Sequence, residues 1–405
     1  MASGISSTKE QAGHGSPFVS FSTVFNNYFL PDALPDLMDT SIKEQETYSI
    51  KKGDILITRT SETIDELAMS CVAVKDYPRA TYSGFTKRLR PKTAGIAYHK
   101  YLAFYLRSQL FRKAVTNNAF MTLRASFNED IFSFLNLYLP EYKEQVKIGD
   151  MLYSMEQKIQ LNKRICAELE AMAKTLYNYW FTQFDFPDEN GKPYRSSGGE
   201  IVWNDQLKRE IPKGWTPGTI SSLMKIENTS VNPQKLGNAL MEHYSIPAFD
   251  ANHNPAYEEA GTIESGKYVV DPECILTSKL NPHFKRLWDP YCDTENAICS
   301  TEFIVYRPRT AWTRPFCYAV LNSEAFYAHM VGKATASTGS RKRIQPDVSA
   351  SFELAIPDEK TMRAFVELYA PIMEKQKALY KENCELTKLR DWLLPVLMNG
   401  QATVE

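Results

Sequence analysis

The sequence lacks several features that would assign it to a familiar class at once. It has no run of about 18 apolar residues, which a membrane-spanning helix needs. Met1 is followed by small polar residues rather than by a charged and then apolar leader, so we expect a soluble, cytoplasmic protein. The seven cysteines form no C-x-x-C pair and do not cluster with the six histidines, so we expect reduced thiols and no metal site.

Catalytic motifs are missing as well. Residues 332–339 (GKATASTG) have glycines and a lysine, but in the wrong order for the phosphate-binding loop G-x-x-x-x-G-K-[ST]. An adenine methyltransferase needs a glycine-rich cofactor loop and an Asn/Asp-Pro-Pro-aromatic motif. The nearest approach is NPHF at residues 281–284, where His283 replaces the second proline, and we interpret it as a turn. The sequence therefore predicts a chain without catalytic residues.

What the sequence does have is length and unevenly placed charge. A chain of 405 residues with 43% hydrophobic residues is large enough for two or three folded units. Its formal net charge is only −1, but residues 75–124 hold 11 basic residues and one acidic residue, a local balance of 11 − 1 = +10. Residues 303–343 hold seven basic residues and one acidic residue, which gives 7 − 1 = +6. Two positive regions in corresponding parts of two halves suggest two surfaces for a polyanion.

An internal repeat with a displacement of 217 residues supports this division into halves. ILIT at residues 55–58 resembles CILT at residues 274–277 with a slip of two residues, as a loop insertion would produce. In each half, short β-type runs such as DILIT, SCVAV and FTKRLR precede a long helix. The matching pairs include Arg90-Pro91 with Arg307-Pro308, Leu139-Pro140 with Ile356-Pro357 and Glu168-Leu169 with Glu385-Leu386.

The two predicted long helices carry matching apolar seams. Alternating steps of four and three residues are typical of the a and d positions of a coiled coil. The first seam consists of Ile148, Leu152, Met155, Ile159, Asn162, Cys166, Leu169, Ala173, Leu176 and Trp180. The second consists of Phe365, Tyr369, Ile372, Gln376, Leu379, Asn383, Leu386, Arg390, Leu393 and Leu397. A single stripe would indicate a helix packed on its own domain, but two stripes in register predict a helix pair.

A short hairpin cannot connect these helices, because a whole domain separates them in the sequence. An antiparallel pair with pseudo-twofold symmetry fits if the residue numbers of seam partners sum to 545, which places Asn162 opposite Asn383. Such a buried Asn pair would fix the register of the helices at some loss of stability. Pro371 is expected to kink the second helix or to mark where its regular part begins.

The segment between the halves carries a resemblance to a known family. A helix ending in LEAMAKTLYNYWF is followed by FDFP, G-x-P-Y, SSGG and IPKGW between Asp185 and Trp215. This junction resembles the one between the halves of the specificity subunits of type I restriction-modification systems. The ending of the second helix, LTKLRDWLLPVLMNGQ at residues 386–401, is similar to the C-terminal segment of that family. The resemblance covers essentially the full chain.

The resemblance implies a mixed α+β fold, in which two globular α/β target recognition domains are separated by two long antiparallel helices that form a coiled coil. Residues 1–140 would form the first recognition domain and 141–184 the central helix, with a linker at 185–210. Residues 211–357 would form the second recognition domain, and 358–400 the distal helix. One departure is that the opening IPKGWTPGTISSLMKI of the second domain has no counterpart in the first, because Ile211 displaced by 217 falls before Met1.

The same resemblance implies a non-catalytic DNA-binding subunit that reads a bipartite, asymmetric site on double-stranded DNA. Its partners would be two modification subunits that bind S-adenosylmethionine and methylate adenine, and restriction subunits that use ATP and magnesium. This chain itself would hold no cofactor. Two alternatives remain: a stand-alone DNA methyltransferase, and an assembly scaffold or decoy subunit without its own DNA readout.

Candidate DNA-contacting residues are cations, amides and hydroxyl groups near the ends of predicted strands, where phosphates and base edges could be reached. In the first half they are Arg59, Ser61, Arg79, Tyr82, Lys87, Asn117, Asn118 and Arg124. In the second half they are Lys279, His283, Lys285, Arg286, Thr335, Thr338, Ser340, Arg341, Lys342 and Arg343. Each single cation could instead be an ordinary solvated charge. Arg90 and Arg307 precede prolines at matching positions, so a shared structural role is as well supported for them as DNA contact.

Overall fold

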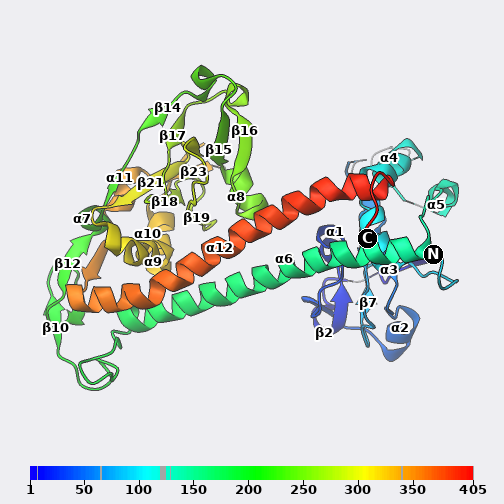
Figure 1. Ribbon diagram of the computed structural model, residues 1–405. Coiled ribbons are helices and arrows are strands. Elements are labelled where there is room, and N and C mark those ends of the chain that lie inside the picture. Colours follow the sequence, from blue (N-terminus) through cyan, green and yellow to red (C-terminus); the bar gives the residue numbers. More distant parts are fainter. Residues whose placement is uncertain (7, 64–65, 119–124, 128, 339–340, 405) are drawn as a thin grey trace. The chain divides into compact units, whose positions relative to one another are not determined.

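The structure is a computed structural model that describes residues 1–405 except residues 7, 64–65, 119–124, 128, 339–340 and 405 (Figure 1). The chain divides into two compact units. The first unit comprises Met1–Ile159 and Leu386–Glu405, and the second comprises Gln160–Glu385. Among the described helices, none combines the length and the apolar character that crossing a membrane requires.

The first unit is built on a four-stranded antiparallel sheet in the order β1-β8-β4-β6. These strands are β1 (Ala2–Ser3), β8 (Thr86–Leu89), β4 (Ile55–Thr58) and β6 (Ser70–Val72). Both faces of β4 are buried, because successive side chains point to opposite sides of a sheet. Ile55 and Ile57 pack into one core cluster and Leu56 into another. The unbroken apolar run ILIT thus reflects a sheet that is covered on both sides.

The second unit repeats this sheet. Its strands follow the order β13-β21-β18-β19 and are also all antiparallel. They are β13 (Met224–Ile226), β21 (Phe303–Pro308), β18 (Ile275–Ser278) and β19 (Leu287–Trp288). Ile55 lies opposite Leu89 in the first sheet, and Ile275 lies opposite Tyr306, the counterpart of Leu89, in the second. ILIT therefore matches ILTS at Ile275–Ser278, with a slip of three residues, and its predicted match to CILT with a slip of two is wrong by one residue. The repeat predicted from the sequence is therefore present in the strand pairing.

The remaining elements of the first unit form a second sheet and several short helices. The strands of this sheet, in the order β3-β2-β7, are β3 (Asp36–Met38), β2 (Ala12–Val19) and β7 (Thr81–Tyr82). The helices are α1 (Phe21–Asn26), α2 (Ile42–Thr47), α3 (His99–Tyr105), α4 (Gln109–Asn118) and α5 (Glu129–Phe134). A further pair joins β5 (Thr60–Ser61) to β9 (Ala125–Ser126).

The second unit has a larger second sheet, in the order β14-β17-β20-β15-β16. Its strands are β14 (Ser230–Val231), β17 (Lys267–Val269), β20 (Ala297–Ser300), β15 (Leu240–Tyr244) and β16 (Ala256–Glu259). The short helices are α7 (Ile220–Leu223), α8 (Ile246–Asn252), α9 (Arg314–Asn322), α10 (Glu324–Lys333) and α11 (Pro346–Ala350). Three antiparallel pairs complete the unit: β10 (Ile201–Asn204) with β11 (Arg209–Pro212), β12 (Thr216–Thr219) with β24 (Glu353–Ile356), and β22 (Thr335–Thr338) with β23 (Arg341–Arg343).

Two long helices run through both units (Figure 1): α6 (Tyr142–Tyr177), which continues into a π-helical turn at Asn178–Thr182, and α12 (Glu359–Met398). Their contacts run in opposite directions along the chain. In the first unit Arg390 pairs with Glu156, and in the second unit Asn383 and Gln376 meet residues 162 and 166. The expected antiparallel helix pair is therefore present.

The centre of the pair is polar, as the seam predicts. Asn162 and Asn383 are both buried, and Nδ2 of Asn162 donates to Oδ1 of Asn383 at 3.0 Å. Nδ2 of Asn162 also donates to the Glu382 carboxylate at 2.7 Å. The expectation that Pro371 marks the start of regular helix is wrong, because α12 already begins at Glu359 and passes through this proline without interruption.

The connector between the halves is an ordered part of the second unit. Its aromatic residues fold back onto one another. The Phe186 ring stacks on Trp215 with centroids 5.1 Å apart and on Tyr194 at 4.7 Å. Phe184 and Trp215 are buried with the end of α6 in the same core cluster. The connector is rich in Gly, Pro and Ser, but its aromatic residues pack together and thereby fix where the chain enters the rest of the second unit.

Candidate nucleic-acid interface

Arg59 and Lys279 occupy equivalent positions in the two units. Each directly follows the central strand, β4 or β18. The backbone N–H of Arg59 donates to the carbonyl of Phe85 at 2.8 Å, and that of Lys279 donates to the carbonyl of Glu302 at 2.9 Å. Residues 85 and 302 are related by the displacement of 217. The repeat therefore presents a cationic side chain at the same end of both sheets.

The second unit joins two polar segments next to Lys279. The backbone N–H of Asn281 donates to the carbonyl of Lys342 at 2.7 Å, and the N–H of Lys342 donates to the Asn281 side chain at 3.0 Å. These bonds tie the turn at 281–284 to strand β23 of the β22–β23 hairpin. His283, Arg341 and Lys342 are exposed on these two segments. NPHF is a turn as expected, since the N–H of Phe284 donates to the carbonyl of Asn281 at 2.9 Å.

Other predicted cations of the second unit are held by carboxylates. Both Nε and Nη2 of Arg286 donate to Asp250 at 2.7 Å, and only 11% of the Arg286 side chain is exposed. Arg343 forms a similar pair with Glu302 at 3.0 and 2.8 Å, and the bond from Arg343 lowers the pKa of the Glu302 carboxyl. Both arginines therefore stabilise the loop and the hairpin that carry the exposed groups.

Lys285 is similarly engaged within the second unit. Its ammonium group donates to the carbonyl of Asn322 at 2.8 Å and lies 3.7 Å from the carboxylate of Glu170 on α6. Burial lowers the pKa of Lys285 despite this carboxylate. Lys285 thus links α9 of the second unit to the long helix α6 and is not a free cation.

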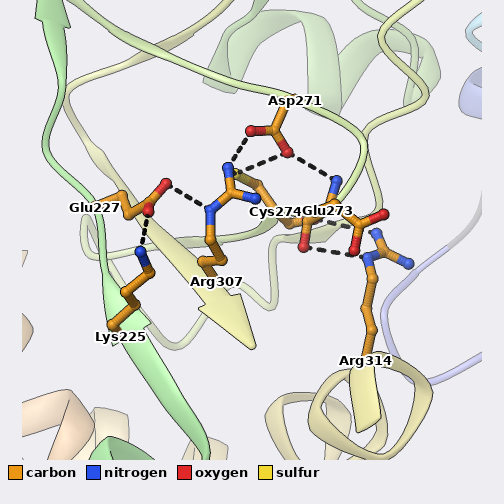
Figure 2. Close-up of polar contacts among 7 residues, drawn as sticks. All are labelled: Lys225, Glu227, Asp271, Glu273, Cys274, Arg307 and Arg314. Carbon is orange, nitrogen blue, oxygen red and sulfur yellow. Dashed lines mark hydrogen bonds and ion pairs between the residues drawn. The ribbon is translucent and has the colours of Figure 1, made fainter. Parts of the chain in front are cut away.

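The matching residues Arg90 and Arg307 are structural in both units. Nε and Nη2 of Arg90 each lie 2.6 Å from the carboxylate of Asp54, which is 1% exposed. Arg307 lies between Glu227, at 2.7 Å, and Asp271 (Figure 2). The two carboxylates are not at equivalent positions, since Asp54 directly precedes β4, whereas Asp271 lies three residues before Cys274, the residue that precedes β18. Of the two roles left open by the sequence, the structural one is supported for both arginines.

The cluster around Arg307 resembles a cation site in its chemistry. Ligand atoms of Glu227, Asp271 and Cys274 lie within 4.8 Å of one another. The Arg307 guanidinium lies among these atoms, as Figure 2 shows, and forms ion pairs with both carboxylates. This side chain supplies the positive charge that a metal ion would otherwise bring.

Two candidates of the first unit are buried and cannot touch DNA in this structure. Tyr82 has no exposed surface, and its hydroxyl donates to the carbonyls of Ala2 and Ser3 at 3.4 and 3.3 Å. Ser61 is 8% exposed, and its hydroxyl accepts from the N–H of Thr63. The interpretation of Tyr82 and Ser61 as DNA-contacting residues was therefore wrong, because both side chains lie near strand ends but are buried in the core.

The remaining candidates are accessible but less closely grouped. Arg79 is exposed in a turn with φ of 60°, and Lys87 is half-buried on β8, where it lies opposite Ile57. Asn117 and Asn118 are exposed at the end of α4, and Thr335 is exposed at the start of β22. Thr338 contributes its backbone to β22. Arg124 and Ser340 lie outside the described residues.

The sequence reasoning missed two exposed aromatic residues among these groups. Phe85 is 63% exposed and accepts the N–H of Arg59 through its carbonyl, and Phe284 is 55% exposed in the turn beside Lys342. The ring of Phe284 lies against the guanidinium of Arg286, 5.1 Å from its centroid. Their turns contain Gly or Pro next to an aromatic residue, SGF and NPHF, which was the available signal.

The basic window of the first unit overstates its free charge. Arg107 donates to three carbonyls near α1 at 2.8 to 2.9 Å and to that of Ser70 at 2.7 Å. Lys100 pairs with Asp150, and Arg112 donates to the carbonyl of Leu67. These cations hold the fold together, so the count of +10 is not the charge available to a polyanion.

Comparison with known proteins agrees with this architecture. Residues 4–171 match the family model described as the type I restriction modification DNA specificity domain. The chain is 23% identical over 386 residues to the type I restriction enzyme MjaIX specificity subunit of Methanocaldococcus jannaschii, covering 91% of this chain and 82% of that protein. It is 22% identical over 446 residues to the HindI specificity subunit of Haemophilus influenzae, covering 95% and 94% of the two chains.

A solved structure shows the same fold. The crystal structure of the type I restriction-modification system S subunit from M. genitalium aligns with a TM-score of 0.58 and 14% identity. The alignment covers 98% of this chain and 92% of that one. The mixed fold with two long helices that the sequence predicts is therefore confirmed.

Proposed function

We propose that the chain is a specificity subunit of a type I restriction-modification system and that it reads a bipartite, asymmetric site on double-stranded DNA. The observation that carries this proposal is the repeated cation position, Arg59 in one unit and Lys279 in the other, at the same end of two equivalent sheets. Two unlike readers on duplicated scaffolds suit two unlike half-sites. The surrounding groups differ between the units, with Phe85 beside Arg59 and with His283 and Lys342 near Lys279.

We assign the contacts by their chemistry. The exposed cations Arg59, Arg341 and Lys342 and the half-buried Lys279 contact phosphates and supply affinity that depends strongly on salt. Side chains with hydrogen-bonding rings or amides, such as His283, suit base edges in the major groove. The domain ranges 1–140 and 211–357 are the proposed recognition domains, and the helix pair is the spacer between half-sites.

We further propose that catalysis is performed by partner subunits. Two modification subunits would dock on this chain and bring S-adenosylmethionine, and restriction subunits would bring ATP and magnesium. The chain itself is proposed to be non-catalytic. Burial raises the pKa of Cys71 and Cys317 to about 12, which makes these thiols poor nucleophiles and fits that role.

The DNA-binding proposal is tested by the salt dependence of affinity. We expect Arg341→Ala/Lys342→Ala to reduce the slope of log K against log salt by about 1.8, because each phosphate contact contributes about 0.9. Lys43→Ala is the control, because Lys43 is an exposed cation on α2 outside the candidate residues, and it should leave the slope unchanged. Fluorescence anisotropy with a labelled duplex and the assembled methyltransferase measures both.

Equal slopes for the parent and the double variant would contradict a role of the hairpin in DNA contact. If the chain were instead a scaffold or decoy without DNA readout, substitutions in it would leave the methylated DNA sequence of the host unchanged. Methylome sequencing of a host with the intact system distinguishes them. Arg59→Ala should impair one half of a two-part motif, and Lys279→Ala the other half.

A further inference from the structure

The second unit contains a cavity of about 350 Å³ that has no part in the proposed DNA contacts. Side chains from α6, α8, β19, α9 and α12 line it, and most of the lining is apolar or aromatic. Small-molecule sites in proteins are concave and mostly apolar, with volumes of about 300–1,000 Å³ and a few polar groups that orient the ligand. The cavity has this size and this composition.

The end of α8 places His253 in the wall of the cavity. His253 caps this helix in the left-handed conformation, with φ of 57°, and its N–H donates to the carbonyl of Phe249 at 3.0 Å. The imidazole stacks on the ring of Tyr380 on α12, with centroids 4.5 Å apart and an interplanar angle of 11°. It also contacts the rings of Phe249 and Trp288. The cavity wall is therefore a fixed aromatic surface that joins α8 to α12.

Three hydrogen-bonding side chains of the lining are not used by the protein itself. Among the residues that the structure describes, none forms a hydrogen bond with the imidazole of His253 or with the hydroxyl groups of Tyr318 and Tyr380. Burial lowers the pKa of His253 to about 4 and raises the pKa of Tyr380 to about 12, so both are neutral at pH 7. Polar groups withdrawn from bulk water are normally hydrogen-bonded, so these three groups can bind a ligand.

The charged groups of the lining leave one cation without a partner. The Glu170 carboxylate lies 3.7 Å from Nζ of Lys285, and the Asp289 carboxylate lies 3.5 Å from Nζ of Lys377. Lys163 on α6 is exposed, and no described residue forms an ion pair with it. The charge that remains at the cavity is therefore positive.

We propose that this cavity binds a small planar heteroaromatic anion. A planar ring suits the aromatic walls, and its nitrogen and oxygen atoms suit the imidazole of His253 and the hydroxyl groups of Tyr318 and Tyr380. The anionic group pairs with Lys163. The site lies between the long helices and the shorter elements of the second unit, and binding there goes beyond the reading of DNA.

Calorimetric titration of the full chain with nicotinate, orotate and adenosine 5′-monophosphate tests the proposal. We expect at least one of these anions to bind, and its uncharged match, nicotinamide, uracil or adenosine, to bind more weakly. Hydrogen exchange then locates the site. The amides of β19 and α9 should exchange about tenfold more slowly at about ten times the Kd of the anion, because binding reduces the population of open states in proportion to ligand concentration.

Substitutions in the lining make the assignment specific. Ala167→Trp should abolish binding, because Ala167 is an exposed residue of α6 that lines the cavity and an indole there would fill it. Ala171→Trp, at an exposed site of the same helix outside the lining, is the matched control and should bind like the parent. Lys163→Gln should weaken binding of the anion by up to about fivefold and leave its uncharged match unaffected. Tyr380→Phe keeps the ring and should weaken both by about two- to tenfold.

Failure of all three anions to bind would overturn the proposal. So would binding that survives Ala167→Trp, because the ligand would then lie elsewhere, and so would equal affinity for the anion and its uncharged match. Circular dichroism verifies that the variants fold. If Ala167→Trp does not fold, unchanged affinity in both Lys163→Gln and Tyr380→Phe overturns the proposal instead. None of these outcomes depends on DNA binding.

Discussion

The ion pair between Arg90 and Asp54 should be worth more than any other charged contact of the first unit's sheet. Arg90→Gln removes a bidentate partner at 2.6 Å and leaves a carboxylate that is 1% exposed, with the N–H of Lys51 as its remaining donor at 2.8 Å. Breaking a fully buried pair costs roughly 3–5 kcal/mol. Since 37% of the Arg90 side chain is exposed and solvent can reach it, we expect about 2–4 kcal/mol.

Hydrogen exchange of the β4 and β8 amides measures this loss locally. At 1.4 kcal/mol per factor of ten, exchange should accelerate roughly 30- to 1000-fold. The double variant Arg90→Gln/Asp54→Asn should cost less than Arg90→Gln alone, because no buried charge remains unpaired. Lys75→Gln is the control: its pair with Asp32 is exposed, at 46% and 74%, and should contribute about 0–1 kcal/mol. A cost of Arg90→Gln no larger than that of Lys75→Gln would refute the reasoning.

Two further predictions concern the second unit. Burial works to raise the pKa of Asp271, but hydrogen bonds, the first from Arg307, outweigh it and lower this pKa, so the pair stabilises the fold above about pH 4 and ceases to do so as pH falls through the lowered pKa. Urea titrations should therefore find Arg307→Gln destabilised at pH 7 and close to the parent near pH 3; an equal deficit at both pH values would contradict this role. At the helix pair, Asn383→Leu should destabilise by about 1–3 kcal/mol, because it removes the buried acceptor at 3.0 Å from Asn162 and leaves Glu382 as the acceptor of that amide. The double variant Asn162→Leu/Asn383→Leu should recover most of that loss. Thermal unfolding checks this cycle, and a double variant as unstable as the single one would contradict it.

The sequence was sufficient to predict the regular parts of the fold. Seam periodicity located both long helices and placed Asn162 against Asn383, because helix packing depends on a spacing that is written in the sequence. The repeat also located equivalent strands. Of the two expectations for Pro371, a helix start there was wrong, because a proline costs a helix one hydrogen bond and the packing of a helix of 40 residues outweighs that loss.

The candidate site was predictable only in part. A count of cations cannot tell Lys342, which is exposed, from Arg343 one residue later, which Glu302 neutralises. The carboxylate partners lie 36 to 41 residues away for Arg286 and Arg343, so no local pattern announces them. Tyr82 misled for a similar reason: an aromatic residue near a strand end has the same local sequence whether it faces solvent or the core.

Both long helices supply side chains to two separate cores. Ile148 and Leu152 of α6 are buried in one, and Ala173 of the same helix is buried in the other. Likewise, Leu397 of α12 belongs to one and Phe365 to the other. Unfolding of either core would remove the packing contacts at one end of both helices. The other ends of the same helices form part of the second core. Calorimetry on this chain should accordingly record unfolding transitions that overlap in temperature, rather than two transitions that are independent of each other.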